Sequence, residues 1–159
     1  MSALTPLGIA HTAVSLVAVV AGFACLWREA AISSRTTLGK TYLVTTAVTA
    51  MTALGIFQHG GFGPPHALAI MTLIALAIGL FAERSAAASR FWAIVMTASF
   101  SVTMLFHMIP AVTESLTRLP VEAPLAASAD APIFQPLYGA LLVAFGVLLT
   151  WQLRRSAKR

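Results

Sequence analysis

Charged residues are scarce in this chain: only 9% of its 159 residues are Asp, Glu, Lys or Arg, whereas 58% are hydrophobic. Soluble globular domains carry about a quarter charged residues, so this composition excludes a water-soluble globule. It also excludes a disordered chain, because so many apolar side chains would collapse in water. The single cysteine, Cys25, excludes an internal disulfide and a cysteine-rich metal site. The composition therefore predicts an integral membrane protein that has the lipid bilayer as its main partner.

The chain has five long apolar runs, each about long enough to cross a hydrocarbon layer of ~30 Å as an α-helix. Helices are expected because a backbone that faces lipid must satisfy its own hydrogen bonds. We predict an all-α fold, a single transmembrane domain over residues 1–159 that forms a five-helix bundle. The predicted helices cover about 7–27, 41–58, 66–82, 91–111 and 133–151, with one external loop at about 112–132.

The basic residues gather in alternate connections between these runs. Nine of the ten lie in the first connection, the third connection or the C-terminal tail, together with two acidic residues. The opposite side has one basic residue, Arg118, with Glu114, Glu122 and Asp130. Basic residues are enriched in cytoplasmic loops, so the N-terminus is predicted outside and the C-terminus in the cytoplasm. The basic surplus is then an orientation signal of a multi-pass protein of the bacterial inner (plasma) membrane, and a nucleic-acid partner is not expected.

The four histidines, His11, His59, His66 and His107, are all predicted near the extracytoplasmic ends of their helices. Each lies in, or directly next to, a different one of the first four apolar runs. Ionisable groups inside a membrane are costly and often functional, and imidazole is the commonest metal-binding side chain. This pattern predicts a histidine cluster close to the outer face.

Two kinds of site would use such a cluster. Two members of the set His11, His66 and His107 could hold a b-type haem, with Arg118 paired to its propionates, for electron transfer or as the anchor of a redox complex. Alternatively, the four histidines with Glu114 offer ligands for a transition metal such as Zn, Cu or Fe. Whether the protein is an enzyme is left open by the sequence.

A second interpretation needs no cofactor. His59 and His66 flank a turn rich in glycine and proline, so either could order that turn. Thr45, Thr49 and Thr52 share one face of the second run, which favours helix packing, with hydroxyls bonded to carbonyls of their own helix. The protein would then be a non-catalytic membrane subunit or a small-molecule carrier, associated with other membrane subunits or with itself.

Two short motifs resemble those of a known family. Residues 61–69 read GFGPPHALA and resemble the GF-x-x-x-H-x-L-S helix start of a bacterial family of predicted multi-helix membrane proteins of unknown function, with Ala69 in place of the serine. Residues 39–42 read GKTY and look like that family's G-R-x-Y, with Lys40 in place of the arginine. The resemblance covers about residues 8–112 and implies a membrane bundle. This chain lacks the two further histidines usual in that family. In outline the arrangement is also similar to the membrane subunits of b-type cytochromes, which implies a bis-histidine haem.

Overall fold

A computed structural model describes residues 5–57 and 61–156, and within these ranges the chain forms five α-helices and no β-strand. The all-α prediction is confirmed for this part of the chain. Four of the helices are long and apolar enough to cross a membrane, and the exception, α2, has 17 residues. The helices are α1 Pro6–Glu29, α2 Thr37–Ala53, α3 Pro64–Ser85, α4 Arg90–Arg118 and α5 Phe134–Ser156.

Helix α2 begins and ends earlier than the apolar run 41–58 predicted. Its first turn is capped by the Thr36 hydroxyl, which accepts a hydrogen bond from the N–H of Gly39. At its other end, the N–H groups of Gly55 and Ile56 bond to carbonyls only three residues earlier in the chain. This tighter pattern ends the α-helix, so the apolar residues that follow Ala53 lie outside it, and residue 58 lies outside the described residues.

Helix α4 is longer than predicted, and it takes up part of the predicted external loop 112–132. It continues past Pro110 to Arg118, and the connection to α5 begins at Leu119. Proline removes one backbone donor without ending the helix, as is common in membrane helices. The hydroxyls of Thr113 and Thr117 bond to carbonyls four residues earlier, in keeping with helical geometry there. The sequence prediction was wrong here because helical hydrogen bonding continues into polar residues beyond the apolar run.

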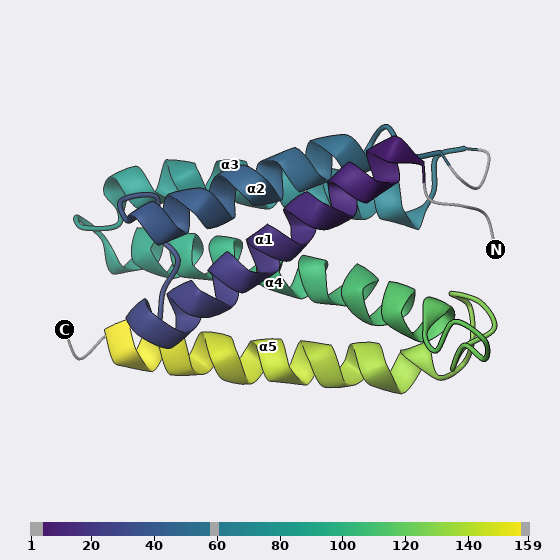
Figure 1. The fold of residues 1–159 in the computed structure, drawn as a ribbon. Helices are drawn as coiled ribbons and strands as arrows, with labels where there is room; N and C mark the ends of the chain where they lie inside the picture. Colours follow the sequence, from purple (N-terminus) through teal and green to yellow (C-terminus); the bar gives the residue numbers. More distant parts are fainter. Residues whose placement is uncertain (1–4, 58–60, 157–159) are drawn as a thin grey trace.

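The other three helices lie over their predicted runs and extend beyond the predicted C-terminal ends. They end at residues 29, 85 and 156, compared with the predicted 27, 82 and 151. Each helix packs against the helix that follows it in the chain, and α1 also contacts α4. Figure 1 shows α1 crossing the bundle obliquely, while α5 lies along α4. The start of α1 and the end of α5 lie at opposite ends of the bundle.

The core lies where α1, α2, α3 and α4 approach closely. Tyr42 and Phe100 are fully buried, and each packs against a glycine of a neighbouring helix, Gly22 and Gly79 respectively. Glycine allows this approach because it has no side chain to separate two helices. The core is therefore built from large rings inserted beside small residues, and α5 contributes little to it: only Phe134 and Gln152 of α5 are buried.

One end of the bundle is tied by a buried carboxylate. Glu83, at the end of α3, is 6% exposed and accepts hydrogen bonds from the Ser33 hydroxyl at 2.6 Å and the Ser34 N–H at 2.9 Å. The guanidinium of Arg35 donates to the backbone carbonyl of Glu83 at 3.4 Å. Hydrogen bonds to a charged acceptor are stronger than neutral ones. They fasten the α1–α2 connection to the end of α3.

Candidate functional site: a polar seam along α2

His11 lies in the second turn of α1 and contacts α2. Its Nδ1 is 3.0 Å from the Oγ1 of Thr52. The single hydroxyl hydrogen of Thr52 is already directed to the carbonyls of Val48 and Thr49. The Thr52 oxygen therefore accepts a hydrogen bond from Nδ1–H, and the neutral imidazole keeps an unprotonated Nε2. His11 is only partly buried, so its ring, including Nε2, lies at the edge of the core.

His107 is buried in the middle of α4 and also contacts α2. It is 8% exposed, and its Nε2 is hydrogen-bonded to the Oγ1 of Thr46 at 3.0 Å. The ring of Tyr42 lies edge-on to the imidazole, with 6.2 Å between ring centroids. A polar group placed among apolar side chains is costly unless it is paired. The bond to Thr46 supplies that pairing and joins α4 to α2.

Tyr42 makes a third bond between the same two helices. The Thr103 hydroxyl donates to the carbonyl of Phe100 at 2.7 Å, so its oxygen accepts from the Tyr42 O–H at 2.5 Å. Together with the two histidine contacts, this forms a line of polar side chains on one face of α2. We call this line the polar seam; it consists of Tyr42, Thr46, Thr49 and Thr52 of α2 with their partners Thr103, His107 and His11.

The polar seam places His11 and His107 at two levels of the bundle. Their partners Thr52 and Thr46 are six residues apart, which corresponds to about 9 Å along the axis of a helix. The sequence predicts one histidine cluster close to the outer face, because it gives only the distance of each histidine from the end of its apolar run. The hydroxyls of Thr45 and Thr52 bond to carbonyls of their own helix, as predicted, whereas the sequence did not identify Thr46 as the partner of His107.

His66 has a different role, at the start of α3. Its Nδ1 accepts a hydrogen bond from the N–H of Gly63 at 3.2 Å and so closes the first turn of the helix. The ring is 4% exposed and stacks against both Phe57 and Phe62, with centroid distances of 4.7 and 5.3 Å. Because Nδ1 accepts, the neutral ring carries its hydrogen on Nε2. This arrangement accounts for the Phe62 and His66 positions of the GFGPPHALA motif.

The two charged residues predicted for the site pair with each other. Arg118 donates through Nε to a carboxylate oxygen of Glu114, one turn earlier on the last turns of α4. Both side chains are partly exposed to solvent. Pairs of this kind stabilise a helix only modestly. The remaining predicted ligand, His59, lies outside the described residues.

The side chains of the site fit the predicted cofactors only in part. In residues 5–57 and 61–156 no three side chains of His, Cys, Asp or Glu come together as a metal site. His66 does not fit as a ligand while the cap bond holds, since its Nε2 then carries hydrogen. His11 fits better, because an Nδ1 that donates to a neighbour and an Nε2 that stays free is the usual state of an imidazole ligand. A three-histidine metal centre and a bis-histidine haem remain predictions.

Sequence reasoning missed two buried polar residues that hold the bundle together. Gln152 of α5 is 1% exposed; its Oε1 accepts from the Ser101 hydroxyl at 2.7 Å, and its Nε2 donates to the carbonyl of Ala30 at 3.1 Å. Glu83 is the other: hydropathy places it only among the charges of the third connection, whereas the structure buries its carboxylate against Ser33 and Ser34. The only sequence signal for Gln152 is that a polar residue directly follows an apolar run. This position is equally compatible with an amide buried in the bundle and with one at the membrane interface.

Comparison with known proteins gives no relative from which a role could be transferred: no family model, no curated protein and no solved structure matches this chain. The functional interpretation therefore depends on the polar seam, the two ends of the bundle and their chemistry.

Proposed function

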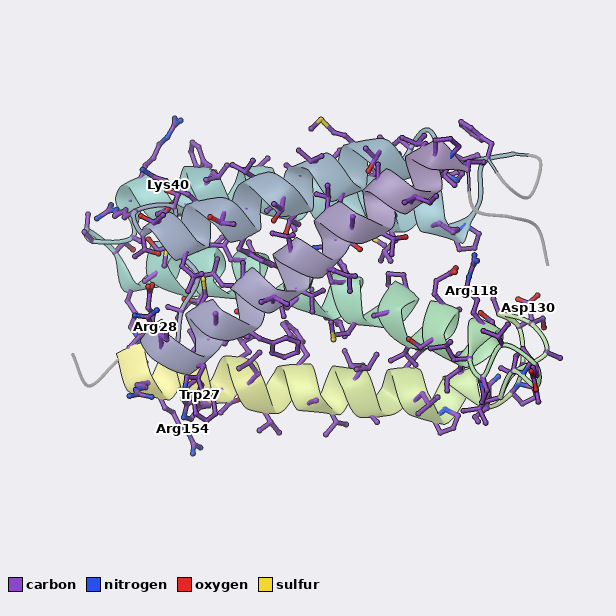
Figure 2. The ribbon with its side chains drawn as sticks, viewed as in Figure 1. Trp27, Arg28, Lys40, Arg118, Asp130 and Arg154 are labelled. Atoms are coloured by element: carbon purple, nitrogen blue, oxygen red, sulfur yellow. The ribbon has the colours of Figure 1, made fainter. Side chains whose placement is uncertain are left out.

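We propose that this chain is a multi-pass protein of the bacterial plasma membrane, with five spanning helices and its N-terminus outside. Helix α2 is about 26 Å long at 1.5 Å per residue, and apolar residues 54–57 follow it, which brings the segment close to the ~30 Å of a hydrocarbon layer. Charge supports the orientation. In Figure 2, Arg28, Lys40 and Arg154 lie at one end of the bundle, and Arg118 and Asp130 at the other.

This topology is tested by labelling single cysteines in intact cells. In a Cys25→Ser background, Ser128→Cys in the α4–α5 connection should react with a membrane-impermeant maleimide added outside. Ala87→Cys, in the α3–α4 connection, should react only after the membrane is permeabilised. Both positions are exposed, so a difference in labelling reports their side of the membrane. The reverse labelling pattern would overturn the orientation, and equal labelling of both positions would show that α4, which lies between them, does not cross the membrane.

Within the membrane, we propose that the protein is a non-catalytic membrane subunit whose interior histidines join helices. The observation that carries this proposal is the pairing of both His11 and His107 with threonines of α2. In lipid there is little hydrophobic force between helices, so interhelical hydrogen bonds and close packing hold them together. A histidine that bonds across a helix pair serves this purpose without any cofactor.

A b-type haem, or a bound transition metal, is the second candidate. It is favoured by one observation, the unprotonated Nε2 that the bond to Thr52 leaves on His11. His107 would be the partner ligand, as the other histidine of the polar seam. Such a group would supply one-electron chemistry, while the helices would orient the imidazoles and exclude water.

One preparation distinguishes the two candidates. The purified full-length protein, produced with haem supplied, is expected to show no Soret band and no stoichiometric metal. His107→Ala should lower the free energy of unfolding by about 1–3 kcal/mol, because the buried Thr46 hydroxyl loses its partner. His107→Gln, which keeps a group able to bond Thr46, should recover part of the loss. Stoichiometric haem that disappears in both His11→Ala and His107→Ala but persists in His59→Ala would establish the second candidate instead.

A further inference from the structure

Thr49 carries a buried hydroxyl that the packing of the described residues leaves unsatisfied. The side chain is 7% exposed, and its Oγ1 has no hydrogen-bond partner within 5–57 and 61–156. Its neighbours on α2 behave differently: the hydroxyls of Thr45 and Thr52 both donate to carbonyls of their own helix. A buried hydroxyl without a partner is unfavourable and calls for an explanation, of which an ordered water molecule is a common one.

The position of Thr49 in the polar seam points to its partner. Thr49 lies three residues after Thr46 and three before Thr52, so the three side chains lie on one side of α2. The flanking threonines bond His107 and His11, from two other helices. Thr49 therefore lies between the two levels at which the imidazoles of His107 and His11 bond to α2.

Each imidazole also has a ring nitrogen with unused hydrogen-bonding capacity. Nδ1 of His11 and Nε2 of His107 bond to threonines, whereas Nε2 of His11 and Nδ1 of His107 bond to nothing in the part of the chain that the structure describes. The unprotonated Nε2 of His11 is an acceptor, and the Thr49 hydroxyl can both donate and accept. A buried water typically makes two to four hydrogen bonds, and these atoms offer the right number.

We propose that α1, α2 and α4 enclose a water-binding site, in which water bonds the Thr49 hydroxyl and the free ring nitrogens of His11 and His107. The ligand is water itself, the smallest molecule that can both donate and accept. The bound water completes the polar seam, so that a continuous line of hydrogen-bonding groups runs along α2 from His11 to Tyr42. The site does not depend on the second candidate, because it uses the imidazoles in their neutral, metal-free form.

Replacing Thr49 with valine tests the proposal, since valine keeps the shape of threonine and removes the hydroxyl. If water is bound, Thr49→Val removes one of its ligands, and the melting temperature of the full-length protein in detergent should fall by about 2–4 °C. If the hydroxyl is dry and unpaired, its removal should leave the melting temperature unchanged or raise it, and that result would overturn the proposal. Thr45→Val is the matched control, because its hydroxyl bonds only carbonyls of its own helix.

A direct measurement of the water accompanies the stability test. Infrared spectra recorded in H₂¹⁶O and H₂¹⁸O should show an isotope-sensitive band of hydrogen-bonded internal water in the wild type and in Thr45→Val. The same band should be lost in Thr49→Val and in His11→Phe. A wild-type spectrum without the band, or a band that persists unchanged in Thr49→Val, would contradict the site.

Discussion

Gly39→Ala should lower the free energy of unfolding by about 2 kcal/mol, the largest effect expected from adding a single methyl group to this chain. A methyl group at this position would overlap the backbone carbonyl oxygen of Ser33 and crowd the Thr36 hydroxyl, which caps α2. A backbone atom cannot move aside as a flexible side chain does. Overpacking costs about 1–3 kcal/mol or more, and the better helix propensity of alanine offsets at most ~1 kcal/mol of this.

Displacing Ser33 would also weaken a second hydrogen bond. Its hydroxyl donates to the buried carboxylate of Glu83, which fastens the α1–α2 connection to α3. Stability is measured by thermal or denaturant unfolding of the detergent-solubilised protein. The control is Gly139→Ala in α5, where a methyl group would meet no atom within 4 Å and should be neutral or slightly stabilising. A Gly39→Ala protein as stable as the control would refute the close approach to Ser33.

Gly79→Ala should have the second largest effect, a loss of about 1–2 kcal/mol once the better helix propensity of alanine is included. A methyl group at Gly79 of α3 would overlap the ring of Phe100 on α4. That ring is fully buried among the core residues, so turning it would displace other core side chains. The two helices would have to separate, and the displacement of α4 would reach His107, which lies two turns further along the same helix.

A compensating substitution makes this prediction specific. Phe100→Leu removes ring atoms from the contact, so Gly79→Ala with Phe100→Leu should be destabilised by less than the sum of the two single variants. Gly146→Ala in α5 is the matched control, because no atom lies within 4 Å of the added methyl group. Additive losses in the double variant would show that Gly79 and Phe100 do not pack as described.

Both short motifs of the sequence acquire structural roles from these contacts. In GKTY, Gly39 permits the close approach of Ser33, and Tyr42 bonds Thr103 in the polar seam. In GFGPPHALA, Phe62 stacks on His66, which caps α3. These roles need no bound ligand, which is a further reason to favour a structural role for His66.

The helix bounds show how far local information reaches. The apolar runs located every helix, but not every helix end. Run 41–58 is shifted relative to α2, which covers Thr37–Ala53, and run 91–111 stops seven residues before the end of α4 at Arg118. The start of α2 depends on a cap by Thr36, and in the last turns of α4 the Thr113 and Thr117 hydroxyls bond to carbonyls of their own helix. Each of these helix ends depends on individual hydrogen bonds, which the hydropathy of a segment does not predict.

The sequence by itself determined that this protein is helical and suited to a membrane, because backbone hydrogen bonds and transfer into lipid depend on each segment's own residues. It also placed the charges at the two ends of the bundle. The tertiary structure decided which polar groups meet. His11 and Thr52 are 41 residues apart in sequence, Thr46 and His107 are 61 apart, and Gln152 and Ala30 are 122 apart. A side chain that must be paired inside an apolar bundle takes whichever partner packing brings within hydrogen-bonding distance, and no local sequence pattern predicts that partner.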